Sequence, residues 1–335
     1  MTELVEAANA RGGGTPLRVH ALAIGKADAL VLELPSGRLA VVDFGHTSLL
    51  AYLDALDPAR RRRYAFALLT HAHDDHYLCV ADFIERHDAR VEQYWFGFAD
   101  AAGIVALEAL KRVALARRGK GRLLIQDGTI PALLALEPGV DLRIFAATSY
   151  ETFRAPATNA MTENNRGIVL LIHYGAAACL LGADVEEARW RRISEQAEAA
   201  GLLLRADVVK APHHGAAPPH GMPDDVWDHV LRDTGTAVIM TVGRSPRHPA
   251  RATIDRIKGR AVVRCTGRAS TCTAIESPTL LTANSPTDLV AQAFPPAPEL
   301  VPTPSCFGTQ IYDLWSTGQV TMSASHMAPP LDACL

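Results

Sequence analysis

The sequence predicts a layered α/β protein. Short apolar segments alternate with helical patterns along the chain, and this alternation favours an α/β arrangement or mixed layers. Hydrophobic residues make up 48% of the 335 positions and charged residues 21%, so the chain can build a core and disorder is excluded as its main state. We find no internal repeat and no linker that divides the chain. One domain is therefore expected over residues 15–325, between a flexible tail at 1–14 and a second tail at 326–335.

The expected strands are short apolar runs bounded by turn residues. They lie at 17–24, 29–34, 39–44, 65–70, 140–147, 206–210, 236–242 and 261–265, with two strands joined by a turn at 167–182 and a final hairpin at 309–314 and 320–322. The turn Pro35-Ser36-Gly37 after the second run is typical of a hairpin. The expected helices have apolar residues three or four apart and lie at 47–57, 98–118, 186–199, 223–232 and 250–258. Residues 277–304 hold many prolines and no clear period, so an extended loop is expected there.

Charge and cysteine content set limits on the partners. The net charge of -3 gives no general attraction to nucleic acid or to an anionic membrane, so any contact with a polyanion would have to be local. The first residues carry acids and lack the apolar centre of a signal peptide, and no segment is typical of a membrane span. The six cysteines form no CxxC pair and are typical of reduced thiols. A cytoplasmic protein without a membrane partner is expected.

The strongest chemical feature is the run His-Ala-His-Asp-Asp-His from His71 to His76, which directly follows the apolar strand at 65–70. These imidazoles and carboxylates cannot share an apolar core, because each buried unpaired polar group costs about 1–3 kcal/mol. A metal cation removes this cost by accepting the lone pairs, and imidazole nitrogen with carboxylate oxygen suits zinc or a similar divalent ion. A strand end that runs into a helix start places His71 and His73 on one side and Asp75 and His76 on another. This arrangement fits two metals better than one.

Two further segments end in residues of the same kind. Asp184 follows the apolar residues 180–183, and the pair His213-His214 follows the strand at 206–210. Taken alone, the aspartate favours a helix cap and the histidine pair is compatible with a turn. Sites in layered α/β proteins gather at one end of the strands. We therefore interpret the three segments as one site.

These residues resemble the motifs of the metallo-β-lactamase-fold hydrolases, whose signature is similar to His71-x-His73-x-Asp75-His76. Other segments resemble the ComEC-like branch, which is named after the hydrolase domain of a DNA-uptake protein. These segments are residues 19–29, 41–45, 210–215, 241–243 with His248-Pro249, and the hairpin from Gly308-Thr309. The matches span residues 17–322. The resemblance implies a four-layer αββα sandwich, in which two mixed sheets pack face to face with helices outside and the metals lie at one edge.

The resemblance also implies a set of metal ligands. These would be His71 and His73 for a first ion, Asp75, His76 and His214 for a second, and Asp184 as a bridge between them. The cofactor would be two divalent ions, zinc or alternatively manganese. A hydroxide between them would be the nucleophile, because coordination lowers the pKa of water from about 15.7 to about 7. Which of His213 and His214 is the ligand stays open at this stage.

Further residues would act on the substrate or on the ligands. Lys210 and His248 could neutralise a substrate anion, and His213 could contact the substrate or donate a proton, beside the metal ligand Asp75. For Lys210, His213 and His248 a structural position is an equally open alternative. Asp43 would orient a ligand histidine, with a turn cap as the alternative.

Three positions depart from the family pattern. Before the strand that starts at Ile168, where many members have another histidine, this chain has the run 164–167, Asn-Asn-Arg-Gly. Water or Asn164 would then complete the shell of the first metal, and a shell richer in oxygen tolerates manganese. Ala216 and Ala27 replace a serine and a glycine.

The motifs predict a metal-dependent hydrolase, and within that class a phosphodiesterase or nuclease. Two metals can stabilise both the attacking and the leaving oxygen of a phosphodiester. The net charge argues against nucleic acid as the substrate, because affinity for it comes mostly from lysine and arginine. The local basic residues that could contact it are Arg60 to Arg63, Lys111, Arg112, Arg117, Arg118, Lys120, Arg122, Arg244, Arg247 and Arg251.

Two alternatives stay open. A hydrolase of a small ester, lactone or thioester would use the same hydroxide chemistry. Its apolar pocket would be lined by Tyr94, Trp95, Phe96 and Phe98, unless these aromatic residues pack in the core. The other alternative is a non-catalytic, metal-stabilised binding module.

Overall fold

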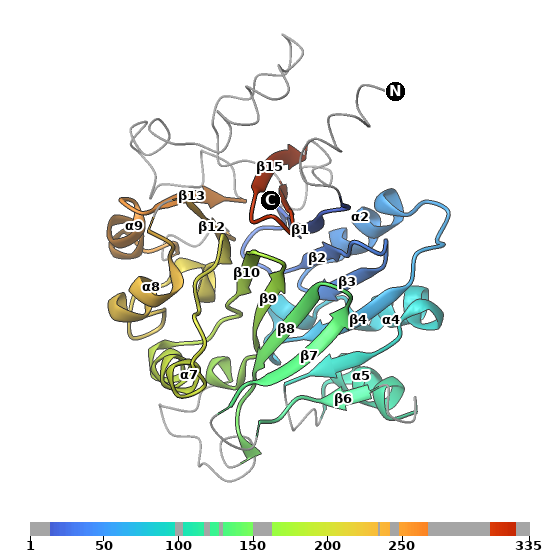
Figure 1. The fold of residues 1–335 in the computed structure, drawn as a ribbon. Helices are drawn as coiled ribbons and strands as arrows, with labels where there is room; N and C mark the ends of the chain where they lie inside the picture. The colour runs from blue at the N-terminus through green and yellow to red at the C-terminus, as the bar shows by residue number, and fades with distance from the viewer. Residues whose placement is uncertain are drawn as a thin grey trace, which may run out of the picture.

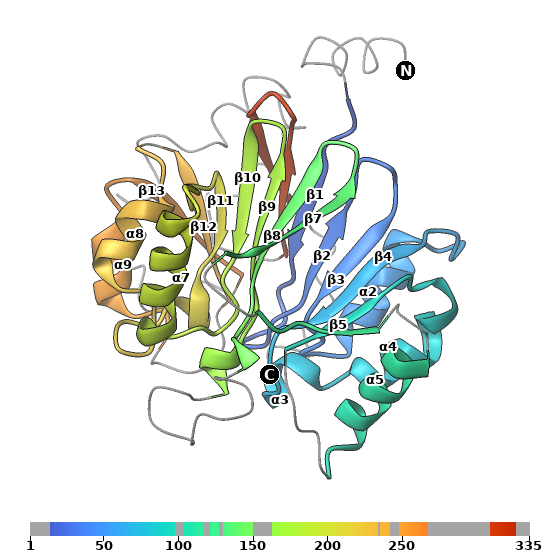
Figure 2. The ribbon, with the colours of Figure 1, turned by 60° about the horizontal axis from the view of Figure 1, so that its bottom comes forward.

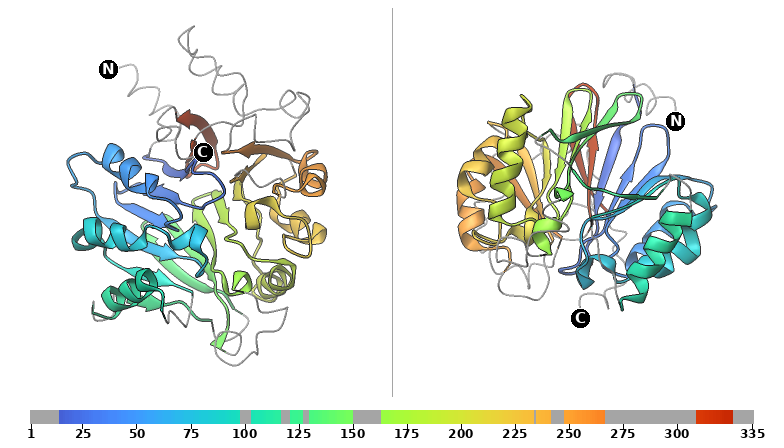
Figure 3. Two further views of the ribbon diagram at one scale, coloured as in Figure 1. Left: turned by 180° about the vertical axis from the view of Figure 1, so that it is seen from behind. Right: turned by 90° about the horizontal axis from the view of Figure 1, so that it is seen from below.

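The computed structural model describes residues 14–97, 103–116, 121–126, 130–149, 163–233, 235–241, 248–266 and 309–325. They form two mixed β-sheets that pack face to face, with helices on both outer faces (Figure 1, Figure 2). The view from below shows the four layers edge-on (Figure 3). The α/β class and the αββα order of layers are thus confirmed. The expected tail at 1–14, apart from its last residue Gly14, the expected tail at 326–335 and the loop at 277–304 lie outside the described residues, so the division into one domain and two tails stays a prediction.

The first sheet has the strand order β15-β14-β1-β2-β3-β4-β5-β6. Its strands are β1 (Leu17–Ala21), β2 (Leu30–Glu33), β3 (Leu39–Val42), β4 (Tyr64–Leu69), β5 (Tyr94–Phe96), β6 (Gly121–Leu123), β14 (Thr309–Leu314) and β15 (Val320–Ser325). The predicted hairpin of β2 and β3 is confirmed, and β3 to β6 run parallel. The predicted final hairpin of β14 and β15 is also confirmed. It pairs with β1, so the last described strands lie beside the first.

The second sheet has the strand order β13-β12-β11-β10-β9-β8-β7. Its strands are β7 (Ala132–Glu137), β8 (Val140–Phe145), β9 (Val169–Tyr174), β10 (Ala177–Leu181), β11 (Val208–Lys210), β12 (Thr236–Met240) and β13 (Ala261–Cys265). The two strands expected within 167–182 are the antiparallel pair β9 and β10. From β10 to β13 the strands run parallel, so their carboxyl ends lie along one edge.

The helices cover the outer face of each sheet. Those on the first sheet are α2 (Ser48–Leu56), α4 (Val80–His87) and α5 (Val105–Ala116), and those on the second are α7 (Glu187–Ala199), α8 (Asp224–Val230) and α9 (Arg251–Ile257). A single turn of helix, α3 (Asp74–Tyr77), follows β4. Within the described residues, no helix has the length and apolar character that a membrane crossing requires.

Apolar side chains form three layers between these elements. Alternate residues of β9 show the division: Leu170 and Ile172 face the other sheet, whereas Val169 and Leu171 face the helices of their own side. A third cluster lies under the helices of the first sheet. Alternate residues of a buried strand therefore point to opposite faces of the sheet, and both faces are covered by apolar side chains.

Some elements were not predicted. β5 and β6 are only three residues long, too short for a readable period. No residue of β7 is fully buried, although Leu134 and Leu136 pack against the core between the sheets. The aromatic residues Tyr94, Trp95 and Phe96 form β5 and are buried, with Trp95 stacked on Phe66 at 4.2 Å between ring centroids. Their alternative role as core residues is confirmed, and Phe98 lies outside the described residues.

Leu170 provides a test of the packing between the sheets. Leu170→Ala is expected to lower the free energy of unfolding by about 2–5 kcal/mol, because apolar contacts are lost and a cavity remains. Leu203 is 74% exposed, so Leu203→Ala should change it by less than about 0.5 kcal/mol. Urea denaturation followed by circular dichroism measures both. Equal effects would contradict the placement of Leu170.

Candidate metal centre

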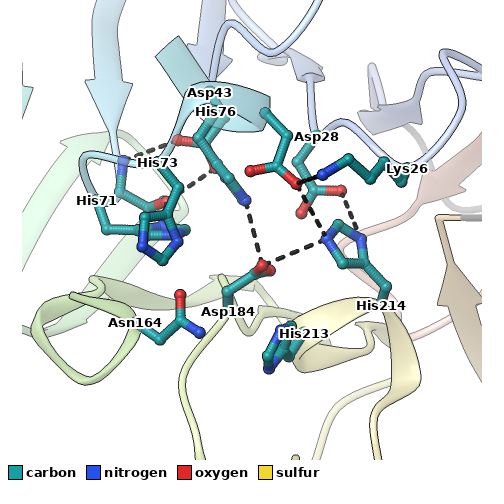
Figure 4. Close-up of polar contacts among 12 residues, drawn as sticks. Lys26, Asp28, Asp43, His71, His73, His76, Asn164, Asp184, His213 and His214 are labelled. Carbon is teal, nitrogen blue, oxygen red and sulfur yellow. Dashed lines mark hydrogen bonds and ion pairs between the residues drawn. The ribbon is translucent and has the colours of Figure 1, made fainter. Parts of the chain in front are cut away.

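The candidate site lies where strands of both sheets end (Figure 4). In the first sheet Asp43 follows β3 and His71 follows β4, while in the second Asp184 follows β10 and His214 follows β11. The strands of each pair are parallel, so their carboxyl ends meet at the same edge. Because the sheets are packed face to face, the two edges bring these side chains together.

The run from His71 to His76 turns from β4 into α3. His71 is fully buried, and its Nδ1 lies 3.1 Å from the hydroxyl of Thr70. Its Nε2 lies 3.2 Å from Nδ1 of His73, close enough for both nitrogens to face one ion. Extended backbone at His73 starts the helix. The change from strand to helix therefore brings the two imidazoles together.

His76 is held between two carboxylates. Its Nδ1 lies 2.8 Å from Asp43 Oδ2, and its Nε2 faces Asp184 Oδ2 at 3.4 Å. Asp43 also accepts hydrogen bonds from the backbone N–H and the hydroxyl of Thr70, at 2.8 and 2.9 Å. These bonds fix the carboxylate. The expected contact of Asp43 with a histidine of the motif is confirmed.

Asp184 lies between two histidines. Its Oδ2 is 3.4 Å from Nε2 of His76 and 3.3 Å from Nε2 of His214, and its Oδ1 makes no hydrogen bond within the described part of the chain. The following helix α7 has Glu186 as its N-cap, so the alternative of a helix cap at Asp184 is wrong. The aspartate occupies the position expected of a carboxylate shared by two ions, a role that stays a prediction.

His214, rather than His213, faces the cluster. His214 is buried, and its Nε2 lies 3.9 Å from Asp75 Oδ2 as well as close to Asp184. His213 is half-buried, and its Nδ1 donates to the carbonyl oxygen of His220 at 2.7 Å. Both residues have a positive φ, 47° and 54°, and this tight turn gives their side chains different surroundings. The geometry favours His214 as the ligand.

A series of buried hydrogen bonds fixes His214 through the Nδ1 atom of its ring. Its Nδ1 lies 2.7 Å from Thr241 Oγ1, and that hydroxyl donates to Asp28 Oδ1 at 2.7 Å. Because its hydroxyl proton is used on Asp28, Thr241 accepts the proton of His214 Nδ1, which leaves Nε2 with its lone pair for the cluster. Asp28 also accepts a bond of 2.6 Å from Lys210 Nζ, and both side chains are 1% exposed.

The donor set fits divalent cations. Ligand atoms lie within 4.8 Å of one another in overlapping groups, among them His71 with His76 and Asp184, and Asp75 with His76 and His214. Several buried atoms make no hydrogen bond to any described residue, namely His76 Nε2, Asp184 Oδ1 and Asn164 Oδ1. Buried polar atoms are normally paired, so a cation that accepts these lone pairs would complete the site. Nitrogen and oxygen donors of this kind suit zinc or manganese.

The two buried histidines His71 and His76 differ in protonation. Burial, with a smaller effect of His76, holds the pKa of His71 well below its usual value, so its imidazole is neutral. Burial opposes a charge on His76, but Asp184 and Asp43 outweigh burial and hold the pKa of His76 well above its usual value. A cation bound at His76 would therefore displace a proton, as metals do when they bind imidazole.

The cluster opens into a cleft of about 590 Å³. Its lining residues are Lys26, His73, Asp74, Asp75, Asn164, Asp184, His213, His214, Thr241 and His248. The rings of His213 and His248 lie 5.2 Å apart between centroids. Burial, followed by the neighbouring His213, lowers the pKa of His248 to about 4, so this imidazole is neutral at pH 7.

The structure brings most of the predicted site residues together. The six expected ligands gather at this edge: His71, His73, Asp75, His76, Asp184 and His214. His213 and His248 line the same cleft. Lys210 does not line it. Its charge is buried against Asp28, because a lysine at the end of a central strand needs a carboxylate to neutralise it. The predicted contact of Lys210 with a substrate anion is therefore replaced by a contact between the two sheets.

Lys26, Asp28 and Thr241 were not predicted as site residues. All three lie in the segments 19–29 and 241–243, where the resemblance was noted. An isolated lysine, aspartate or threonine next to a strand is indistinguishable from an ordinary turn residue. Only the approach of the two sheets shows that these side chains meet.

The basic run at 60–63 lies away from the site. It precedes β4, whereas His71 follows it, so the run and the site are at opposite ends of a six-residue strand. Arg60 and Arg63 form ion pairs with acidic neighbours at 2.9 and 3.2 Å, and Arg251 does so at 3.0 Å. Arg244 and Arg247 lie outside the described residues.

The comparisons with known proteins concern the fold. No protein-family model and no curated protein sequence matches the chain. The chain is similar to the metallo-β-lactamase-fold protein YhfI from Bacillus subtilis, with 12% identity and a TM-score of 0.46 over 75% of this chain and 96% of that one. It is also similar to a mutant of the β-hydroxylase CmlA, with 17% identity and a TM-score of 0.39 over 79% of this chain and 51% of that one. The chain thus spans about half the length of CmlA.

A third similar structure is Zn²⁺-bound PqqB from Methylobacterium extorquens, with 13% identity and a TM-score of 0.36 over 57% of this chain and 71% of that one. The two mixed sheets with outer helices are the architecture that the resemblance to the metallo-β-lactamase fold implied. Membership of the ComEC-like branch stays a prediction.

Thr241 provides a test of the hydrogen bonds that join His214 Nδ1 to Asp28. Thr241→Val keeps the shape but removes the hydroxyl, so His214 Nδ1 loses its acceptor and Asp28 loses a donor. The affinity for Zn²⁺, measured by competition with a chromophoric chelator, is expected to fall about 10–100-fold, and Thr241→Ser should restore most of it.

The matched control is Thr236→Val, at the other end of β12, where the hydroxyl donates to the carbonyl oxygen of Ala206 at 3.0 Å. It should leave the affinity for Zn²⁺ unchanged. An equal loss in both valine variants would mean that Thr241 acts through the fold alone.

Proposed function

We propose that this chain is a metal-dependent hydrolase whose substrate is a phosphodiester. The observation that supports the proposal is the position of Asp184, one oxygen of which lies 3.4 and 3.3 Å from the Nε2 atoms of His76 and His214. Each histidine is fixed through its Nδ1, by Asp43 or by Thr241, so each keeps Nε2 for the site. A carboxylate between two such nitrogens suits a pair of cations that share it.

The residues of the chain would hold and orient the reacting groups. Divalent ions bound here would lower the pKa of a coordinated water and stabilise charge on the attacking and leaving oxygens. Asp43 and the Asp28–Thr241 pair keep the two histidines in the tautomer that presents Nε2. Since these contacts exist before any substrate binds, the ligands need little rearrangement during the reaction.

His213 is the candidate proton donor to the leaving group. Its Nδ1 is engaged with the carbonyl oxygen of His220, so Nε2 is the ring nitrogen that can exchange a proton. His213 lines the cleft beside His248. Because His248 has a pKa of about 4, it is suited to a hydrogen bond with the substrate and not to a charge–charge contact.

The shape and lining of the cleft favour a small anionic ester. A volume of about 590 Å³ lies within the range of small-ligand sites, about 300–1,000 Å³, and fits one nucleotide-sized group. Three of the four aromatic residues predicted to line an apolar pocket, Tyr94, Trp95 and Phe96, are buried in β5, which argues against an apolar lactone or thioester. A nucleic-acid strand would place a single phosphodiester linkage in this cleft.

Asp184→Asn tests the proposal, because it keeps the size of the side chain and removes its charge. Hydrolysis of bis(p-nitrophenyl) phosphate, with Mn²⁺ or Zn²⁺, is expected to fall by at least about 100-fold, since the carboxylate can no longer serve two cations. Asp225→Asn is the matched control: Asp225 lies on α8 with 63% of its side chain exposed and should keep full activity. A labelled DNA strand assayed in parallel separates a nuclease from an enzyme for small diesters.

Three other outcomes would contradict the proposal, each with protein shown to carry about two metal ions per chain. Hydrolysis of p-nitrophenyl acetate without hydrolysis of either diester would favour the small-ester alternative. Binding of a diester without turnover would indicate a binding module. Equal activity of the Asp184→Asn variant and the wild type would remove Asp184 from the mechanism.

A further inference from the structure

Lys26 is the one lysine or arginine that lines the cleft among the described residues. It lies in the loop between β1 and β2, with 60% of its side chain exposed. Its Nζ is 3.1 Å from Asp75 Oδ2, and the same oxygen is 3.9 Å from Nε2 of His214. The ammonium group thus lies beside the candidate ligands of the second metal (Figure 4).

The backbone around Lys26 is anchored to the histidine motif. The N–H of Asp28 donates to the carbonyl oxygen of Asp75 at 3.0 Å, and the N–H of Gly45 donates to the carbonyl oxygen of Asp28 at 3.0 Å. Gly45 leaves no room for a side chain, because a Cβ there would lie 2.0 Å from the carbonyl oxygen of Asp75. The loop that carries Lys26 is therefore fixed relative to Asp75.

The ammonium group of Lys26 can move, whereas the backbone of Lys26 is fixed. A lysine ammonium is a compact charge at the end of a flexible stem of four carbons, and here most of the side chain is exposed. Asp75 is the acidic partner of Lys26 in the structure and also a candidate metal ligand. An ammonium group and a divalent cation at the same carboxylate repel each other. With Asp75 engaged by a metal, Lys26 would turn to another anion within reach.

We propose that Lys26 selects an anionic substrate by binding a non-bridging phosphoryl oxygen in the cleft. This inference rests on the proposed function and names the group that recognises the charge of the phosphodiester. Lysine binds phosphate as a point charge and is a cation at neutral pH. The other nitrogen-bearing side chains that line the cleft are histidines and Asn164, none of which carries a permanent charge.

Two variants of Lys26 test the inference. Lys26→Gln keeps much of the length and removes the charge, whereas Lys26→Arg keeps the charge. The quantity measured is kcat/KM for bis(p-nitrophenyl) phosphate divided by kcat/KM for p-nitrophenyl acetate, with Mn²⁺-loaded protein. This ratio is expected to fall about 10–100-fold in Lys26→Gln, mainly through the KM of the diester, because a hydrogen bond to a charged group is lost. It should stay within about three-fold in Lys26→Arg, which keeps a charged donor.

The matched control is Lys258→Gln, since Lys258 has 43% of its side chain exposed, pairs with Asp255, and is not among the residues that line the cleft. Its ratio should equal that of the wild type. A fall of the same size for both substrates in Lys26→Gln would overturn the inference, because Lys26 would then act on the metal site and not on the substrate charge.

A second readout needs no turnover. Calorimetry with inorganic phosphate and Mn²⁺-loaded protein should show about ten-fold weaker binding for Lys26→Gln, while the affinity for Mn²⁺ itself does not weaken. Unchanged phosphate binding, or equal losses for phosphate and for Mn²⁺, would overturn the inference. If the wild type hydrolyses no diester, the proposed function fails, yet phosphate binding still decides whether Lys26 recognises the anion.

Discussion

The buried ion pair between Lys210 and Asp28 joins the two sheets at the edge where the site forms. Lys210 ends β11 of the second sheet, Asp28 lies in a loop of the first, and the Nζ to Oδ2 distance is 2.6 Å. Removing one partner of such a pair leaves an uncompensated buried charge, at a cost of about 3–5 kcal/mol. The pair therefore favours one position of the sheets, in which Asp28 also reaches Thr241 and Thr241 reaches His214. The orientation of His214 depends on a contact between the sheets and not only on its own strand.

Local sequence patterns could predict the α/β class and the densest part of the site, whereas the order of the four layers was implied by the family resemblance. Strands such as β4, β9 and β10 are long apolar runs, and His71 to His76 brings its ligand atoms together within a single turn from strand to helix. Contacts between distant residues could not be predicted in this way. Asp28 and Lys210 are 182 positions apart, and each looks like an ordinary residue beside a strand. The burial of Lys210 followed from the packing of the sheets, which no local pattern describes.

Backbone strain is concentrated around the same edge. Among the described residues, the non-glycine positions with positive φ include Asp43, Ala183, His213 and His214, which lie within four residues of the ends of β3, β10 and β11. Such conformations cost of the order of 1–3 kcal/mol each and persist only where other contacts fix them. Here the contacts are visible: His213 N–H donates to the carbonyl oxygen of Ala183 at 2.9 Å, and Asp43 is held by Thr70. The fold thus stabilises a strained arrangement that keeps the candidate ligands in place before anything binds.

The balance of charge at this site bears on which ions the site can hold. The carboxylates that contact the site histidines are Asp28, Asp43, Asp75 and Asp184. Two lysines of the described residues contact this set, Lys210 at Asp28 and Lys26 at Asp75. With every histidine in the neutral form that binds a metal, four negative charges would face two positive ones, an excess that is unfavourable in a buried place. Two divalent cations would reverse the excess to two positive charges. A phosphodiester anion would lower that positive excess on binding and a neutral ester would not, so the balance of charge supports the proposed anionic substrate.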